Sequence, residues 1–354
     1  MASIFIIILN ITRTGGTERA VINLANILVK KYDVTILSLQ SKKKESPYFA
    51  INEKVKIQHL EICDIPSNIF YKLKWQKIVY EKLTKIMKSN SIVIGTGHNI
   101  NVLLPFLKKI KRIACEHIQL DSIPKSHRII MRLLYPLNDA LVVLSNSAYE
   151  KYKNYNRNIQ LIPNSLPFEI GDSSTLLHKR IIMVGRLSHE KGYDRILKIA
   201  TYISENYPEW SIHIFGNGPM KNKLEELYCK EGLNKWIYIH EPTKTIQDEY
   251  LKSSIYMMTS YNEALPMVLL EAKSCGLPVI AYECEGTKSL IKDGYDGFLI
   301  EDDNSDIFIR KLGVLIDDVD IRRRLGKNAI DSSKAYSSSE ILNKWVKLIK
   351  SFIV

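Results

Sequence analysis

The chain has 354 residues, 45% of them hydrophobic and 25% charged, a composition that is typical of soluble globular proteins and excludes fibrous and largely disordered chains. One hydrophobic core rarely serves so many residues, so we expect two domains. The formal net charge of +12 lies in the first half, because residues 1–170 contain 25 Lys and Arg against 12 Asp and Glu; this half is predicted to face nucleic acid, an anionic membrane or a phosphorylated acceptor.

Short apolar runs alternate with longer amphipathic stretches through the first half of the chain. The runs of strand length lie at residues 4–9, 34–39, 92–94, 113–115, 140–144 and 159–162. The stretches between them include residues 20–30, 102–108 and 148–152. This alternation predicts βαβ units, in which a parallel sheet has helices on both faces. The first run lacks the basic residues and the cleavage site of a signal peptide, so we expect a buried strand there.

The alternation stops at residues 163–175, where Pro, Asn, Ser, Gly and Asp are frequent and predict an interdomain linker. It resumes at residue 181 and continues to residue 300. No apolar run approaches the ~20 residues that a membrane-spanning helix needs, so any membrane contact is expected to be peripheral.

The last segment, residues 337–354, is expected to form a helix with one apolar stripe of Ile341, Trp345, Leu348 and Phe352. The sequence therefore predicts an α/β protein of two Rossmann-like domains, residues 1–168 and 169–336, followed by this helix, which is expected to cross back and pack on the N-terminal domain. Ligands of such parallel sheets bind beyond the carboxyl ends of the strands.

Two adjacent glycines, Gly15 and Gly16, follow the first expected strand at a strand-to-helix turn. Glycines there let a phosphate approach the backbone closely, and the helix N-terminus adds positive potential. The loop is neither a GxGxxG nor a Walker A motif, which argues against a dinucleotide enzyme or a nucleoside triphosphatase. A tight turn without a ligand is the alternative interpretation.

Two further strand ends, in the second half, carry groups suited to a nucleotide diphosphate. One contains Gly185 and Arg186 and then Lys191, so two cations five residues apart can clamp a pair of phosphates. A solvated Arg and Lys on a loop is the alternative. The other contains Gly216 and Asn217, where the missing side chain leaves room for a base or a ribose.

The strongest motif runs from Glu263 to Glu271 and reads EALPMVLLE. Pro266 is expected near the first position of a helix, where it needs no amide hydrogen. Free helix amides at Met267 and Val268 can then receive a phosphate, while the two carboxylates accept hydrogen bonds from sugar hydroxyls. Carboxylates near a helix N-terminus are also favoured by the helix dipole, so a purely structural role is the alternative.

Taken together, these motifs resemble the retaining GT-B glycosyltransferases of the large bacterial family that carries two glutamates with seven residues between them (glycosyltransferase family 4-like). The resemblance covers nearly the whole chain in the family's order. The matching segments are Gly15–Glu18, Glu116–His117, Val143–Ser145, Pro163–Asn164, Gly185–Leu187, Lys191–Gly192, Gly216–Gly218 and Glu263–Glu271. The resemblance implies a GT-B fold, with the two parallel sheets facing a central cleft.

The resemblance also implies roles for the four charged residues of the second half. Glu271 would bind the ribose hydroxyls of the donor, and Glu263 would lie near the transferred sugar. Arg186 and Lys191 would hold the diphosphate and stabilise the leaving group in place of a metal ion. No metal site and no cofactor other than the donor are expected.

In the first half, the resemblance implies that Gly16 closes its loop over the phosphates and that His117 contacts the donor sugar or the acceptor. Without the family, His117 is equally well explained as a hydrogen-bonded core histidine. The chain departs from many relatives at Ala264, where they have glycine. This departure puts the fit of the donor in question.

Two basic segments, residues 67–90 and 123–135, have the pattern of amphipathic helices. In the first, the residues at helical spacing are Ile69, Leu73, Tyr80, Leu83 and Met87. Such helices can lie in an anionic membrane interface, where each nearby cation contributes about 1 kcal/mol. An ordinary surface helix with solvated lysines is the alternative. Because many family members extend glycans on lipid carriers, a polyprenyl-diphosphate-linked acceptor is expected to meet the basic half.

These observations predict a retaining, metal-independent transferase that moves a hexose or N-acetylhexosamine from a nucleotide diphosphate sugar to a glycan or lipid-linked acceptor in bacterial surface polysaccharide synthesis. UDP is the preferred nucleotide, because relatives with the early Gly-Gly-x-Glu-Arg pattern commonly use UDP-sugars, and GDP-mannose is the alternative. A sugar-nucleotide epimerase of the same fold and a basic nucleic-acid-binding protein are the competing functions, and the paired acids fit both poorly.

Five cysteines without a CxxC pair favour reduced thiols and a cytoplasmic location. Together with the basic first half, this predicts a peripheral position at the inner face of the plasma membrane.

Overall fold

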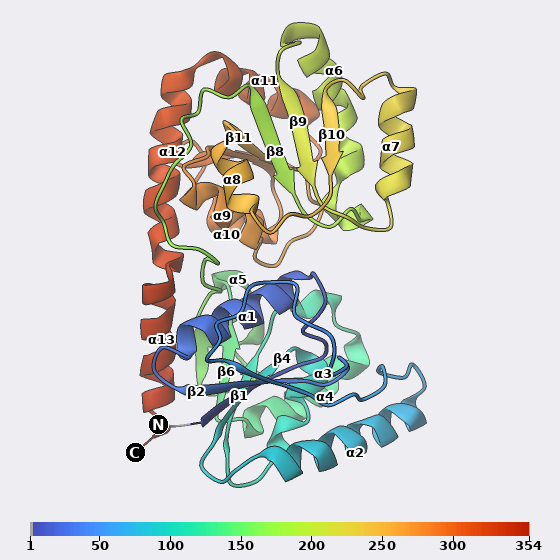
Figure 1. Cartoon of the computed structure of the whole chain (residues 1–354), viewed down its shortest axis with the longest axis vertical. Coiled ribbons are helices and arrows are strands. Elements are labelled where there is room, and N and C mark those ends of the chain that lie inside the picture. The colour runs from blue at the N-terminus through green and yellow to red at the C-terminus, as the bar shows by residue number, and fades with distance from the viewer. Residues whose placement is uncertain (1–2, 354) are drawn as a thin grey trace. The chain divides into compact units, whose positions relative to one another are not determined.

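The computed structural model describes residues 3–353, apart from the side chain of Ile69. The chain divides into two compact units, seen in Figure 1. Unit 1 contains Met1–Pro167 and Ser338–Val354, and unit 2 contains Phe168–Ser337. Each unit is a parallel sheet with helices on both faces, which confirms the α/β architecture expected from the alternating apolar runs.

The sheet of unit 1 has the order β3-β2-β1-β4-β5-β6-β7, and every described pair of neighbours is parallel. Its strands are β1 (Ser3–Ile8), β2 (Asp33–Ser38), β3 (Lys56–His59), β4 (Ile92–Thr96), β5 (Lys111–Cys115), β6 (Ala140–Val143) and β7 (Ile159–Leu161). The strand β3 was not predicted from the sequence, because this edge strand is largely exposed and has no apolar run.

The helices of unit 1 cover both faces of its sheet (Figure 1). They are α1 (Gly16–Leu28), α2 (Ile69–Ile86), α3 (His98–Asn101), α4 (Lys125–Leu134), α5 (Asn146–Tyr152) and α13 (Ser338–Lys350), with the 3-10 turns η1 (Leu104–Phe106), η2 (Leu120–Ser122) and η3 (Tyr135–Leu137). The stretch 102–108 forms only the turn η1, because Pro105 has no amide hydrogen and Lys109 has a positive φ of 62°.

The apolar stripe expected on α2 is wrong in part. The side chains that reach the core of unit 1 are Trp75, Val79 and Leu83, at intervals of four residues. Leu73, which was expected on that stripe, is 59% exposed, and the side chain of Ile69 lies outside the described residues. The error arose because apolar residues occur on more than one face of this lysine-rich helix, so that spacing alone does not single out the buried face.

Unit 2 has a parallel sheet of order β10-β9-β8-β11-β12-β13. Its strands are β8 (Arg180–Val184), β9 (Ser211–Phe215), β10 (Ile237–His240), β11 (Ile255–Met258), β12 (Val279–Tyr282) and β13 (Gly297–Ile300). Its helices are α6 (Ile196–Asn206), α7 (Lys221–Lys230), α8 (Ile246–Leu251), α9 (Met267–Ser274), α10 (Glu285–Leu290), α11 (Ser305–Asp317) and α12 (Val319–Ser333), with turns η4 (His189–Lys191), η5 (Tyr193–Arg195) and η6 (Lys334–Tyr336).

The helix α13 belongs to unit 1, where it packs beside α1. Its buried side chains include Ile341, Trp345 and Leu348 of the expected stripe. Within residues 3–353, no helix combines the length and the apolar character that crossing a bilayer requires. All five cysteines are free thiols.

Candidate functional site

In unit 2 the strand order changes direction between β8 and β11. The loops that leave the carboxyl ends of these two strands therefore meet at the switch point, the place where open α/β sheets bind ligands. The loop after β8 contains Gly185, Arg186 and Lys191, and the loop after β11 leads to Glu263 and α9. Residues separated by more than 70 positions are thus brought to one edge of the sheet.

Glycines hold the loop after β8 in a compact form. Gly192 has a φ of +64°, and a β-carbon there would lie 2.1 Å from the carbonyl oxygen of Thr259. The Thr259 hydroxyl in turn donates to the Gly192 carbonyl oxygen at 2.8 Å. Only glycine fits this position, because the backbone is left-handed and the neighbouring loop leaves no space for a side chain.

Lys191 and Glu263 meet at this point. The Lys191 ammonium donates to Glu263 Oε1 at 2.7 Å, and the two side chains are 24% and 10% exposed. The Ser260 hydroxyl donates to the same oxygen at 2.9 Å. The structure therefore places the predicted cation and the predicted sugar-side acid in contact, in partly buried surroundings where charges interact more strongly than in water.

Arg186 lies earlier in the same loop and is exposed. Its guanidinium makes no ion pair with any residue between 3 and 353, so its hydrogen-bond donors can turn toward the phosphates of a ligand. No group of three His, Cys, Asp or Glu among the described residues is arranged to hold a metal ion.

The strand end with Gly216 and Asn217 has a structural explanation of its own. A β-carbon at Gly216 would lie 1.9 Å from the Gly185 carbonyl oxygen, so the two loops can approach this closely only because residue 216 is glycine. The Asn217 amide nitrogen donates to Glu241 Oε2 at 2.9 Å, and its Oδ1 accepts from the Gly218 amide at 2.7 Å. Contact of Gly216 and Asn217 with a base or ribose stays a prediction.

The helix α9 begins at Met267, and Pro266 precedes it as the N-cap residue. The amides of Met267 and Val268 have no acceptor within the helix, because the first turn of any helix lacks preceding carbonyls. Met267 is buried and Val268 is partly exposed. This helix end follows directly from the loop that carries Glu263, so free amides and a carboxylate are presented side by side.

The backbone around Ala264 does not need glycine. Among the described residues with positive φ, Ala264 is absent, so its conformation is open to any side chain. The close approach in this region occurs instead at Gly286 in α10, where a β-carbon would lie 2.7 Å from the Glu263 carbonyl oxygen. Gly286 could not be singled out from the sequence, because a glycine in a helix does not indicate which residues pack on it.

Glu271 lies in the second turn of α9 and is fully buried. The Tyr250 hydroxyl donates to its Oε2 at 3.2 Å. The structure thus separates the two acids of the motif into a partly exposed one, Glu263, and a covered one, Glu271. A ribose reaches Glu271 only where the ligand also lies against the start of α9, and this role stays a prediction.

Tyr261 joins the two loops and was missed from the sequence. Its amide donates to the Glu190 carbonyl oxygen at 2.9 Å, and its ring stacks on His189 with centroids 5.3 Å apart. The Arg195 guanidinium lies 4.6 Å from the ring centre of Tyr261 and 3.8 Å from that of Tyr282. One aromatic residue before an acid is too common a pattern to reveal such a contact.

In unit 1, the glycine pair follows β1 at the start of α1. A β-carbon at Gly15 would lie 2.4 Å from Glu18 Oε2, so a larger residue there would force the Glu18 side chain to move. At Gly16 no atom lies within 4 Å of the added carbon. Burial raises the pKa of Glu18. The space beside Gly16 is therefore open to an approaching ligand.

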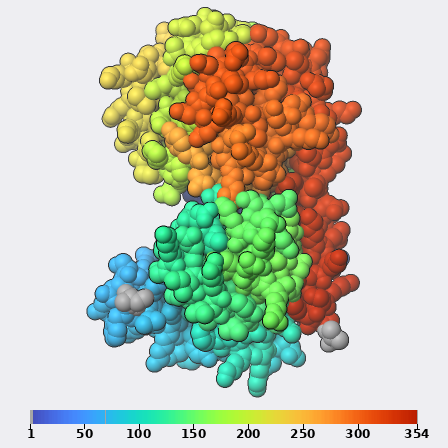
Figure 2. Space-filling model, turned by 180° about the vertical axis from the view of Figure 1, so that it is seen from behind, coloured from blue at the N-terminus to red at the C-terminus, as the bar shows by residue number. Residues whose placement is uncertain are grey.

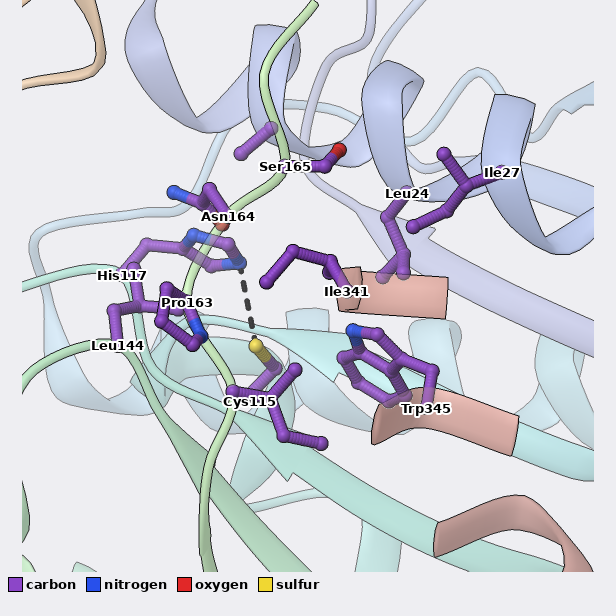
Figure 3. Close-up of a pocket in the computed structure, with 12 residues that line it drawn as sticks. Leu24, Ile27, Cys115, His117, Leu144, Pro163, Asn164, Ser165, Ile341 and Trp345 are labelled. Carbon is purple, nitrogen blue, oxygen red and sulfur yellow. Dashed lines mark hydrogen bonds between the residues drawn. The ribbon is translucent and has the colours of Figure 1, made fainter. Parts of the chain in front are cut away.

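His117 follows β5 and lines a pocket of unit 1 (Figure 3). The other lining side chains in that view include Cys115, Leu144, Pro163 and Trp345. The His117 Nε2 lies 3.5 Å from the Cys115 sulfur. Burial lowers the pKa of His117 to about 4, so its imidazole is neutral at pH 7 and can both donate and accept a hydrogen bond.

Glu116, next to His117, is buried at the end of β5. Tyr135 and Asn101 both donate to its Oε1. Burial raises the pKa of Glu116 to about 7, against the lowering effect of these two hydrogen bonds. Glu116 is therefore a structural acid of the His117 loop rather than an exposed ligand group.

Residues 176–332 match the family model described as "Glycosyl transferases group 1". The chain is 30% identical over 365 residues to the amylovoran biosynthesis glycosyltransferase AmsD of Erwinia amylovora, covering 98% of this chain and 99% of the relative. It is 28% identical over 349 residues to the GalNAc-alpha-(1->4)-GalNAc-alpha-(1->3)-diNAcBac-PP-undecaprenol alpha-1,4-N-acetyl-D-galactosaminyltransferase of Campylobacter jejuni, covering 95% of each chain.

Solved structures of low sequence identity share the architecture. The structure of S. aureus TarM in complex with UDP and sugar ligands has a TM-score of 0.81 at 15% identity and covers 99% of this chain and 100% of its own. The structure of Anabaena HepE in complex with UDP and glucose has a TM-score of 0.78 at 15% identity, with the same coverage. These similarities confirm the GT-B fold.

Proposed function

The chain belongs to the group 1 glycosyl transferases and has the GT-B fold, and from this premise we propose that it moves a hexose or N-acetylhexosamine from UDP to a glycan or polyprenyl-diphosphate-linked acceptor, with retention at the anomeric carbon. The observation that carries the proposal is the contact of Lys191 with Glu263 at the switch point of unit 2, beside the exposed Arg186.

The chemistry follows from what such a reaction demands. Breaking the anomeric C–O bond leaves positive charge on the sugar and negative charge on the departing diphosphate, so the site must stabilise that anion. Lys191, Arg186 and the first amides of α9 supply positive charge there, and this supports a reaction that proceeds without a metal ion. The acceptor attacks from the face that the nucleotide leaves, and the departing phosphate oxygen takes the acceptor's proton.

The contact with Lys191 gives Glu263 a defined task. Its Oε1 is occupied by Lys191 and Ser260, so the carboxylate is held in one orientation beside the cation that meets the phosphate. A sugar hydroxyl donating to this carboxylate would be fixed relative to the breaking bond. Glu271, buried behind the start of α9, would receive the ribose.

The choice of UDP rests on the similar structures, of which TarM and HepE were solved with UDP, and on the Gly15–Gly16 pattern. The Campylobacter relative acts, by its name, on a sugar linked to diphospho-undecaprenol, and the Erwinia relative serves amylovoran biosynthesis. Both support a role in bacterial polysaccharide synthesis with a lipid-linked acceptor.

Exposed apolar side chains on unit 1 support the same acceptor. Phe70 and Leu73 on α2 are 72% and 59% exposed, and Leu133 on α4 is 69% exposed. Lysines lie between these apolar residues along α2, which stands out in blue at the lower left of Figure 2. Exposed apolar side chains with cations around them are suited to the interface of an anionic bilayer, so the protein would work at the inner face of the plasma membrane.

The donor experiment incubates the purified chain with UDP-glucose, UDP-galactose, their N-acetylated forms and GDP-mannose, with and without a prenyl-diphosphate-linked sugar. We expect one UDP-sugar to give UDP and an extended acceptor, with the donor's anomeric configuration kept in the NMR spectrum of the product. Interconversion of free sugar nucleotides without transfer would instead identify an epimerase. An inverted product would contradict the retaining mechanism.

The membrane experiment compares sedimentation with phosphatidylglycerol vesicles for the natural chain and the Leu73→Ser/Leu133→Ser variant. Leu177→Ser is the matched control, because Leu177 in unit 2 is 64% exposed. The double variant should lose most of its vesicle binding, and the control should keep it. Equal binding of all three proteins would contradict the proposed surface.

A further inference from the structure

Unit 1 has a switch point of its own, between β1 and β4. The loop after β1 carries Gly15 and Gly16, and the chain after β4 passes through Gly97, with a φ of +90°, to His98 at the start of α3. Since all strands of the sheet are parallel, His98 lies at the same edge as His117 after β5. This is the position where a second ligand of the protein is expected to bind.

Three basic side chains from three elements gather at this point. The rings of His98 and His127, which is in the first turn of α4, meet edge to face with centroids 5.0 Å apart. Lys72 near the start of α2 is close enough for its charge to act on both imidazoles. Burial, and after it the neighbouring His127 and Lys72, lower the pKa of His98 to about 4.

Among the described residues, the charges that act most strongly on His98 and His127 are positive, and burial also lowers the pKa of Lys72. The acid near the start of α4, Asp121, is held by Lys151 at 2.7 Å, with Arg128 at 3.8 Å. Neighbouring basic groups disfavour each other's protonated form. A bound anion favours that form and would raise the pKa values of the two histidines.

Several buried nitrogen atoms of these elements also lack a hydrogen-bond partner. Among the described residues, His98 Nδ1, His127 Nε2 and Arg128 Nε are buried without a hydrogen-bond partner. Buried polar atoms are nearly always hydrogen-bonded, so their occurrence together on adjoining elements requires an explanation. The helices α2 and α4, which carry Lys72 and His127, also carry exposed apolar side chains. These are Phe70 and Leu73 on α2, and Ile130 and Leu133 on α4.

We propose that Lys72, His98 and His127 form a subsite for the diphosphate of a lipid-linked acceptor, whose prenyl chain runs over the exposed apolar residues of α2 and α4. This inference rests on the proposed function and adds the chemistry by which the acceptor is held. The diphosphate accepts hydrogen bonds from the Lys72 ammonium and from imidazoles that take up protons on binding, so that both histidines act as charged donors in the complex.

The first test measures the binding of inorganic pyrophosphate to the full chain at pH 7 by calorimetry and by the imidazole signals of its NMR spectrum. Lys72→Gln should weaken binding by about tenfold or more, the scale of one charge-assisted hydrogen bond. Lys74→Gln is the matched control, because Lys74 is exposed on the same helix and its removal changes the net charge equally. The control should stay within about twofold of the natural chain.

Pyrophosphate should also shift the signals of His98 and His127 in the direction of protonation, with uptake of protons in the calorimeter. The signals are assigned with His98→Gln and His127→Gln, and His59, which contacts the Ser41 hydroxyl, serves as the internal reference. Equal effects of the two lysine variants, or signals of His98 and His127 that do not move, would overturn the inference.

The second test separates the two sources of a phosphate group. Lys72→Gln should weaken binding of a soluble short-chain prenyl diphosphate sugar much more than Lys74→Gln does, and should change binding to phosphatidylglycerol vesicles no more than Lys74→Gln does. Loss of vesicle binding alone would assign the cluster to lipid headgroups and overturn the acceptor assignment. UDP binding, measured on every variant, reports both folding and the donor site. If UDP binds but the pyrophosphate results fail, the subsite is refuted and the proposed function stands; if UDP does not bind the natural chain, the proposed function fails.

Discussion

Replacing Lys191 by methionine tests the donor site most directly. The substitution keeps an unbranched side chain that is one atom shorter, and it removes the ammonium that lies 2.7 Å from Glu263 Oε1. If this ammonium stabilises the departing diphosphate, its loss resembles the loss of one preorganised donor at a developing anion, which costs about 2.7–4 kcal/mol, or 10²–10³ in kcat. We expect a fall of this size in kcat for transfer from the preferred UDP-sugar.

The loss of Lys191 also affects stability, because Glu263 keeps a charge in a site where its side chain is only 10% exposed. The Ser260 hydroxyl still donates to it, so we expect the free energy of unfolding to fall by about 1–3 kcal/mol. Lys198→Met is the matched control. Lys198 also pairs with an acid, Asp306, at 2.6 Å, but both side chains are exposed, and such surface pairs contribute about 0–1 kcal/mol.

The assay measures kcat and KM for UDP release in the presence of acceptor, and urea unfolding in parallel. Lys191→Met is measured both alone and in a Glu263→Gln background. A direct effect on the diphosphate persists in that background, whereas a lysine that only orients Glu263 has no further effect once the carboxylate is gone. A fall in kcat that matches that of Lys198→Met, or one that vanishes beside Glu263→Gln, would refute the reasoning.

Three further predictions concern stability. Gly216→Ala places a β-carbon 1.9 Å from the Gly185 carbonyl oxygen and should lower the free energy of unfolding by about 1–3 kcal/mol in urea titrations, whereas Gly171→Ala, which meets no atom within 4 Å, should leave it nearly unchanged. Lys273→Met should cost about 3–5 kcal/mol in the same assay, because it strands Asp296 in a pair whose side chains are each 2% exposed; a loss no larger than that of Lys252→Met, at an exposed lysine, would count against it. Burial raises the pKa of Glu116 to about 7, so the folded protein keeps a proton that the unfolded chain loses near pH 4.5, and the associated stability is present below pH 4.5 and lost as the pH rises toward 7. Measured against Glu116→Gln, the natural chain should lose about 3 kcal/mol across that range, and parallel pH profiles of the two proteins would contradict the buried acid.

The sequence motifs singled out two residues, Lys191 and Glu263, that the structure brings into contact. Lys191 and Glu263 are recognisable because each sits at a predictable place, just after an apolar run that forms a buried strand. Their contact across 72 residues follows from the parallel order of β8 and β11, which brings the two carboxyl ends together. The exposure of Arg186 and the burial of Glu271 could not be predicted, because both residues look equally polar in the sequence.

Unit 1 shows the limits of sequence patterns more clearly. The two basic segments were visible as lysine-rich amphipathic stretches, yet the buried face of α2 was assigned wrongly. His98 and His127 had no signal at all, since a single histidine after a strand or in a helix is common. Their cluster with Lys72 exists only because α2, α3 and α4 converge at one edge of the sheet.

The sequence by itself determined the properties that depend on neighbours along the chain: the alternation of strands and helices, the division into two α/β units, the glycine turns and the acids near a helix start. These are local, because hydrogen bonds within helices and the alternation of side chains along strands are set over a few residues. Tertiary structure alone decided which side chains are buried from solvent. The pairing of Lys191 with Glu263, the buried carboxyls of Glu116 and Glu271, and the positive cluster at His98 all depend on desolvation, which residues distant in sequence impose by packing together.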